Sequence, residues 1–92
     1  MSDFKLYEEF KSLYETNNLT ALMSRTMREL MNYNVLLMDK VVAVRATTEA
    51  EQYAENEYEH FIVVELYTEH LLKAVLKVGE KGTVKSEIKF GD

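Results

Sequence analysis

The sequence predicts a single α+β domain over residues 1–92, with an N-terminal helical pair, a short acidic helix and a small antiparallel β-sheet that ends in a C-terminal hairpin. Three observations support this fold class. Apolar residues recur at helical spacing up to about residue 33, and they alternate with polar residues from about residue 60 onward. A hydrophobic content of 47% is enough to build one core in a chain of 92 residues.

The first 33 residues hold the predicted helical pair. The first helix covers residues 3–15, because aromatic residues lie three or four positions apart within it: Phe4, Tyr7, Phe10 and Tyr14. Asn17 and Asn18 suit a left-handed helix exit followed by an N-cap, so a second helix is expected from about Leu19 to about Tyr33. Its methionine stripe predicts core packing, with a dimer seam or a groove for a partner helix as the alternative. The stripe consists of Met23, Met27 and Met31.

The middle of the chain predicts one strand and one short helix. A cluster of β-branched residues favours a strand from about Val41 to Ala46. A helix is expected next, from about Glu49 to Glu57, because Thr48 and Glu51 have the spacing of a capping box. Four residues would share one face of this helix: Ala50, Tyr53, Ala54 and Tyr58.

Residues 60–67 alternate as a strand does. Ile62, Val64 and Leu66 lie on one side of it. The other side carries Phe61, Val63, Glu65 and Tyr67. This second side is too apolar for simple exposure, so a homodimer that covers it is a further expectation.

The C-terminal segment predicts a β-hairpin. Residues 72–78 and 84–90 each alternate between apolar and polar positions, and a turn with the sequence GEKG connects them. The expected register sets Lys73 opposite Glu87. Residues 68–79 also fit a helix, but alternation on both sides of the turn favours the strand.

Negative charge is concentrated in the centre of the chain. Residues 46–70 carry seven acidic residues and no basic one, whereas residues 71–92 carry five lysines and three acidic residues. On a helix, glutamates four positions apart repel each other unless bases compensate them, and tyrosine is enriched in interfaces. We therefore expect an acidic surface that binds a partner; the alternative is a helix face that is merely solvated. The surface would consist of Glu49, Glu51, Tyr53, Glu55, Glu57, Tyr58 and Glu59.

This charge pattern favours a non-enzymatic protein-interaction module, a small acidic intracellular regulator or inhibitor that binds a basic site on a partner protein. A special case is a mimic of DNA phosphates, of the type found among phage-encoded and anti-defence inhibitors. Another alternative is direct binding of nucleic acid through the lysine-rich hairpin, against which the net charge of −5 argues. The lysines concerned are Lys73, Lys77, Lys81, Lys85 and Lys89.

No catalytic residue, cofactor or metal site is predicted. The chain has no cysteine, and its four serines lie outside any Gly-x-Ser-x-Gly context. Glu57 and His60 have the spacing by which a helix presents two metal ligands, but dinuclear sites need that pattern twice. No apolar run approaches the roughly 20 residues that cross a bilayer, and the N-terminus lacks the apolar stretch of a secretory signal. A cytoplasmic protein without membrane contact is therefore expected.

Overall fold

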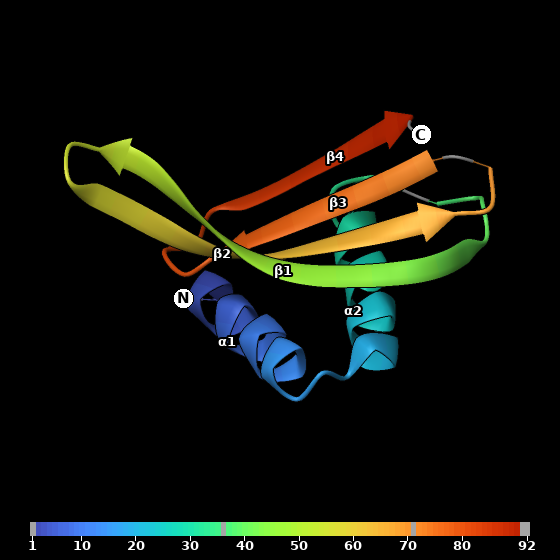
Figure 1. The fold of residues 1–92 in the computed structure, drawn as a ribbon, viewed down its shortest axis with the longest axis horizontal. Coiled ribbons are helices and arrows are strands. Elements are labelled where there is room, and N and C mark those ends of the chain that lie inside the picture. The colour runs from blue at the N-terminus through green and yellow to red at the C-terminus, as the bar shows by residue number, and fades with distance from the viewer. Residues whose placement is uncertain (1, 36, 71, 91–92) are drawn as a thin grey trace.

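The computed structural model describes residues 2–35, 37–70 and 72–90, with side chains described from Lys5 onward. The described chain forms two helices followed by four strands (Figure 1). These elements are α1 (Ser2–Glu15), α2 (Leu19–Met31), β1 (Val41–Ala54), β2 (Glu57–Thr68), β3 (Leu72–Gly79) and β4 (Val84–Phe90). The predicted α+β class, with its C-terminal hairpin, is confirmed.

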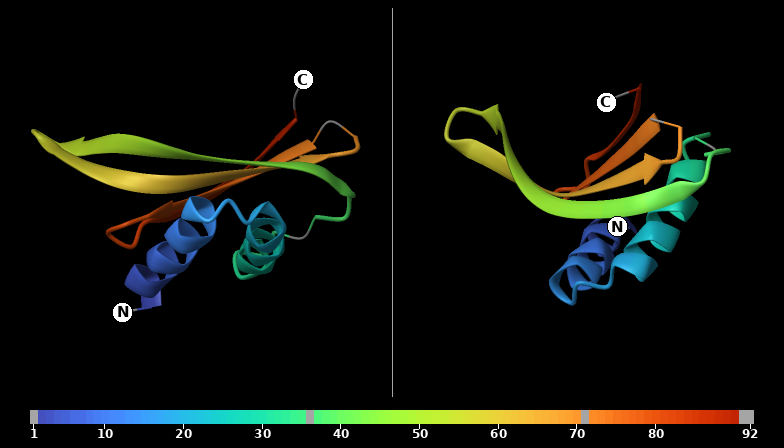
Figure 2. Two further views of the ribbon diagram at one scale, coloured as in Figure 1. Left: turned by 60° about the horizontal axis from the view of Figure 1, so that its bottom comes forward. Right: turned by 45° about the vertical axis from the view of Figure 1, so that its right-hand side comes forward.

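The helices and the sheet form two layers (Figure 2). The strands lie in chain order, and each one pairs antiparallel with the next. α1 packs against β2 and β3, and α2 packs against β1 and β2. One face of the sheet is therefore covered by helices. The opposite face, which carries Phe61 and Val63 of β2, is called the open face below.

The helix boundaries follow from two asparagines, as predicted. Asn17 adopts a left-handed conformation with φ of 55°, which ends α1. Asn18 is the N-cap of α2, and its Oδ1 accepts a hydrogen bond of 3.2 Å from the Ala21 N–H. The second helix ends at Met31, two residues earlier than predicted, because Asn34 again takes a left-handed conformation with φ of 61°.

The main core lies between the helices and the sheet. Its buried residues alternate along β2 and β3 and recur at helical spacing in α1 and α2. They include Tyr7, Phe10, Leu22, Leu30, Ile62, Val64, Leu66, Ala74, Leu76 and Val78. Met23 and Met27 pack against this core, as predicted, whereas Met31 is 58% exposed. The side chain of Phe4, the first member of the aromatic stripe, lies outside the described residues.

The predicted acidic helix over residues 49–57 is wrong. Residues 49–54 continue β1 without interruption, and residues 47–52 pair with residues 63–58 of β2. Asn56 has a φ of 61°, so it reverses the chain at the position where a helix would have continued. The capping-box spacing of Thr48 and Glu51 therefore has no helix to cap, and the predicted strand over residues 41–46 extends to Ala54.

The C-terminal hairpin forms, but in a different register. Residues 72–79 are a strand, as favoured, and not a helix. Lys73 lies opposite Lys89, and Val75 lies opposite Glu87, so the predicted pairing of Lys73 with Glu87 is wrong. The reason is the turn, in which the Gly79 N–H donates to the Thr83 carbonyl at 2.7 Å. Thr83 thus belongs to the connection, and each partner on β4 moves along the strand by two residues.

Candidate interaction site

The β1–β2 hairpin projects beyond the rest of the sheet. β3 pairs with β2 only over Phe61–Tyr67, so residues 50–60 form a two-stranded arm that no third strand supports (Figure 1, left). We call residues 50–60 the β1–β2 arm. It carries six of the seven residues predicted as a partner-binding surface, and the seventh, Glu49, lies at its base.

The glutamates near the base of the arm are paired with lysines of the C-terminal hairpin. Lys77 Nζ lies 2.9 Å from Glu49 Oε2 and 3.1 Å from Glu51 Oε2. Lys85 Nζ lies 2.6 Å from Glu51 Oε1. The Lys85 ammonium, together with Lys77, lowers the pKa of Glu51 to about 2. Bases therefore compensate this part of the acidic block from distant positions in the sequence, which analysis of neighbouring residues could not detect.

These charged side chains cover a second, smaller apolar cluster on the open face. Phe61, Val63 and Val75 are at most 5% exposed although no helix lies over them. Lys85 Nζ lies 5.3 Å from the centre of the Phe61 ring, so the lysine stem and its ammonium cover the ring. The second side of the strand was predicted to need a cover, and side chains of the same chain supply it.

Glu59 is a structural residue, not an exposed one. It is only 6% exposed, and its carboxylate lies against the turn between β3 and β4. Its Oε2 accepts a hydrogen bond of 2.9 Å from the Lys81 N–H, and its Oε1 accepts one of 2.8 Å from the Thr83 hydroxyl. Glu59 therefore joins the base of the arm to the neighbouring hairpin and is not available to a partner.

The far end of the arm is exposed and partly ordered by its own contacts. Tyr53 and Tyr58 are 53% and 51% exposed. The Tyr53 hydroxyl donates a hydrogen bond of 2.9 Å to Glu57 Oε1, which raises the pKa of Tyr53, and Lys81 Nζ lies 5.8 Å from the centre of the Tyr53 ring. Among the described residues, Glu55 and Tyr58 have no side-chain hydrogen bond or ion pair.

The seven predicted residues thus separate into two groups. Glu49, Glu51 and Glu59 are held by internal partners. The other four gather at the far end of the arm, which we call the arm tip: Tyr53, Glu55, Glu57 and Tyr58. The signals in the sequence that could have indicated this hairpin are Asn56 and the β-forming residues on either side of it.

The lysines of β3 and β4 do not form a free basic strip. Each of the four lies within 4.0 Å of a glutamate carboxylate. They are Lys73, Lys77, Lys85 and Lys89. Direct binding of nucleic acid through this face would have to compete with these internal ion pairs.

Two histidines lie in acidic surroundings. Glu57 and His60 lie on a strand, not on a helix, so the helical spacing considered for metal ligation does not apply. His60 Nδ1 lies 2.8 Å from Glu80 Oε1, and this contact lowers the pKa of Glu80. His70 lies in the β2–β3 turn, where its Nδ1 is 2.8 Å from Asp39 and its N–H donates to the same carboxylate.

Asp39, Glu69 and His70 bring three ligand-type atoms within 4.8 Å of one another. The contacts to His70 hold the pKa of Asp39 at about 2. Both carboxylate oxygens of Asp39 already accept hydrogen bonds from His70, so closure of the turn accounts for the arrangement.

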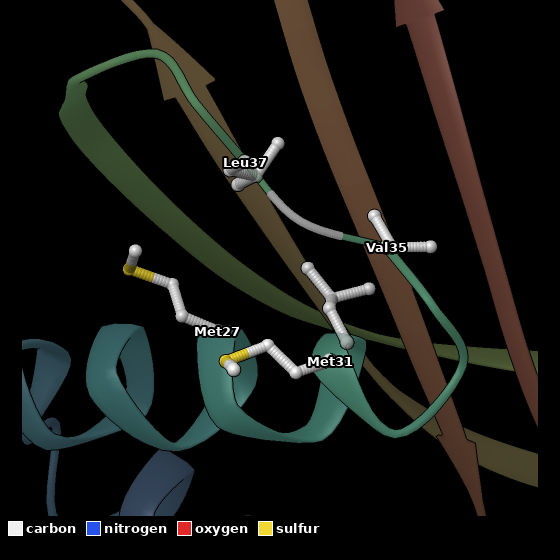
Figure 3. Close-up of a pocket in the computed structure, with 5 residues that line it drawn as sticks. Met27, Met31, Val35 and Leu37 are labelled. Atoms are coloured by element: carbon white, nitrogen blue, oxygen red, sulfur yellow. The ribbon is translucent and has the colours of Figure 1, made fainter.

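The hollows beside α2 are apolar. One of about 40 Å³ is lined by Met27, Leu30, Met31, Val35 and Leu37 (Figure 3). A more open groove of about 230 Å³ lies between α2 and the start of β1. No acidic, basic or histidine side chain lines either hollow, so neither offers an acid–base group to a substrate.

No protein-family model, no curated protein and no solved structure matches the chain. The class of the molecule is therefore defined by its own fold, a small α+β domain in which two helices cover one face of a four-stranded antiparallel meander. Within the described residues, no helix is long and apolar enough to cross a membrane.

Proposed function

We propose that this protein is a non-enzymatic interaction module whose arm tip binds a basic site on a partner protein, so that the protein acts as a small regulator or inhibitor. The observation that supports this most directly is the arm itself. It carries two half-exposed tyrosines and the acidic side chains of Glu55 and Glu57 beyond a body in which most neighbouring charges are paired.

The arm tip has the composition of an interface centre. Tyrosine supplies a large contact area and a polar hydroxyl at a small cost in side-chain entropy. Tyr53 is already fixed by Glu57 and by Lys81, so it loses little further freedom on binding. Tyr58 is adjacent to Glu59, which lies on the open face, so alternation along β2 places Tyr58 on the other face of the arm from Tyr53. Tyr58 and Glu55 have no internal partners among the described residues, so their polar groups are available to another molecule.

Charge then selects the class of partner. Glu55 and Glu57 present two carboxylates at a projecting end, which attracts a lysine- or arginine-rich surface and steers its approach. DNA mimicry in a phage-type or anti-defence inhibitor would be a special case of this proposal. It is less favoured, because Glu49, Glu51 and Glu59 are engaged internally and a row of carboxylates at phosphate spacing is not available.

The test separates the arm tip from the paired glutamates with two variants of equal charge. E55Q/E57Q removes two charges at the arm tip, whereas E49Q/E51Q removes two at its base. A photo-crosslinking amino acid is placed at Tyr58 in each background and at the exposed Ser24 of α2 as a positional control. Irradiation in cells is followed by nuclease treatment and mass spectrometry.

We expect one defined protein adduct from position 58 that is absent from position 24. The adduct should be lost in E55Q/E57Q, because the attraction to a basic site is lost, and retained in folded E49Q/E51Q, because that pair faces lysines of its own chain. Circular dichroism establishes the folded fraction of each variant. Equal adducts from both positions, or an adduct that E55Q/E57Q leaves unchanged, would contradict the proposal.

A further inference from the structure

β4 is a regular strand at the edge of the sheet. It pairs with β3 alone among the described strands, runs for 7 residues and shows no register shift against β3 (Figure 1). The opposite edge strand, β1, has register shifts between Val41 and Ala43 and between Gln52 and Ala54. Bulges of this kind discourage strand addition, whereas a straight edge with unpaired backbone groups favours it. The two edges therefore differ in their ability to accept another strand, and β4 is the competent one.

Apolar side chains of β4 extend past the layer of helices. Ile88 pairs with Ala74, a buried residue of the main core, so it lies on the face that the helices cover. Since the helices pack on β1, β2 and β3, Ile88 remains 38% exposed and Phe90 remains 87% exposed. These two side chains form an apolar row at the edge that a second layer would bury.

Charges on the other side of β4 are self-complementary. Lys85, Glu87 and Lys89 alternate in sign on the open face. If an antiparallel second copy were centred on Glu87, like charges would face each other at every one of these positions. If it were centred on Ile88, Glu87 of each copy would face Lys89 of the other. If it were centred on Ser86, Glu87 of each copy would face Lys85 of the other. Lys85 is already paired with Glu51 at 2.6 Å, whereas Lys89 has only a 3.7 Å contact to Glu87, so the register centred on Ile88 uses the less engaged lysine.

We propose that a second copy of this chain pairs antiparallel with β4 about a two-fold axis at Ile88. The two sheets then form one continuous sheet with four strands from each copy, Ile88 meets Ile88 across the axis, and Phe90 meets Ser86. This surface is distinct from the open face of β2, whose apolar residues are covered within one chain. The β1–β2 arm is formed by β1 and β2, away from the β4 edge of the sheet, so the arm remains exposed in both copies. The dimer does not depend on the function proposed above.

Charge reversal tests the register. Sedimentation velocity over a concentration series gives the dimer dissociation constant of wild type, E87K, K89E and E87K/K89E. Each single variant places two pairs of like charges across the axis and should raise the dissociation constant roughly 10-fold or more. The double variant restores opposite charges and should recover most of the affinity. A wild type that stays monomeric at about 0.5 mM overturns the proposal.

Cysteine crosslinking provides a second measurement, since the chain contains no cysteine of its own. In Ile88→Cys the two introduced residues would face each other at a Cα separation of about 5 Å, within the range that a disulfide spans. In the matched control Ser86→Cys they would lie about 13 Å apart along the strands. Rapid oxidation to a dimer in Ile88→Cys but not in the control is expected. Faster crosslinking of the control, or equal slow crosslinking of both, excludes this register.

Discussion

Gly79 should not tolerate a side chain, although it lies at the end of a regular strand. It pairs with Phe61 across the β2–β3 ladder. A Cβ added at position 79 would lie 2.8 Å from Glu59 Cδ and 2.9 Å from Phe61 Cε2, closer than atoms at such positions approach in proteins. Both neighbours are almost fully buried, and the Glu59 carboxylate accepts hydrogen bonds from the Lys81 N–H and the Thr83 hydroxyl, so displacing either side chain costs stability.

The effect of Gly79→Ala on the free energy of unfolding is the sum of two destabilising contributions and one stabilising contribution. Overpacking by one methyl group costs about 1–3 kcal/mol, while replacing glycine by alanine restricts the unfolded chain and returns about 0.4–1 kcal/mol. If the methyl group displaces the Glu59 carboxylate, a hydrogen bond from Lys81 or Thr83 to a charged acceptor is also weakened, at about 1.5 kcal/mol or more. We therefore expect Gly79→Ala to lower the free energy of unfolding by about 1.5–3 kcal/mol and the Tm by about 10 °C.

Urea denaturation followed by circular dichroism measures this change. The control is a double-mutant cycle with Glu59→Ala, which removes one of the two contacting side chains. In that background Gly79→Ala should cost clearly less, because the added methyl group has space. If Gly79→Ala stabilises the protein, or if its cost is the same with and without Glu59, then the close contact does not determine stability at this position.

Two further changes test the interior and the charged open face. Thr26 is fully buried and its hydroxyl has no hydrogen-bond partner among the described residues, so Thr26→Val should stabilise the protein by about 1 kcal/mol in urea denaturation, and an unchanged or lower value would contradict this reasoning. Glu51 has a pKa of about 2 in the folded protein against 4.5 ordinarily, so its ionised form stabilises the fold above about pH 4.5, and this stabilisation is lost as the pH falls toward 2. The difference in unfolding midpoint between wild type and E51Q should therefore be full at pH 7 and should vanish near pH 2, whereas a difference that persists at pH 2 would refute a role for the charge.

Local rules were sufficient for the helical half of the fold. The left-handed exit at Asn17 and the N-cap at Asn18 involve atoms a few residues apart, so the sequence around them determines the outcome. The same holds for the alternation of Ile62 and Val64, which lie on the face of β2 that the helices cover. The prediction of a strand within residues 68–79 was also correct, because apolar and polar residues alternate on both sides of the turn.

The acidic segment could not be predicted in this way, because its conformation depends on distant residues. A capping-box spacing and helical apolar spacing between residues 48 and 58 indicated a helix, and each of these local preferences is worth at most about 1–2 kcal/mol. Pairing with β2 provides a ladder of backbone hydrogen bonds along the segment, and Lys77 and Lys85 neutralise charges that a helix would have left unpaired. The register of the C-terminal hairpin had a similar cause, since the backbone hydrogen bond from Gly79 to Thr83 fixes the turn and moves each partner on β4 by two residues from its predicted position.

The distribution of charge in space also decides how the binding surface must be tested. Replacing the five glutamates of residues 49–59 together would combine two effects, since Glu49, Glu51 and Glu59 hold strands and turn together while Glu55 and Glu57 do not. A loss of binding in such a variant could follow from unfolding of the arm alone. Because E49Q/E51Q and E55Q/E57Q change the net charge equally, any difference in binding between them depends on position and not on overall charge. Only that difference separates a surface that attracts a partner from charges that stabilise the sheet.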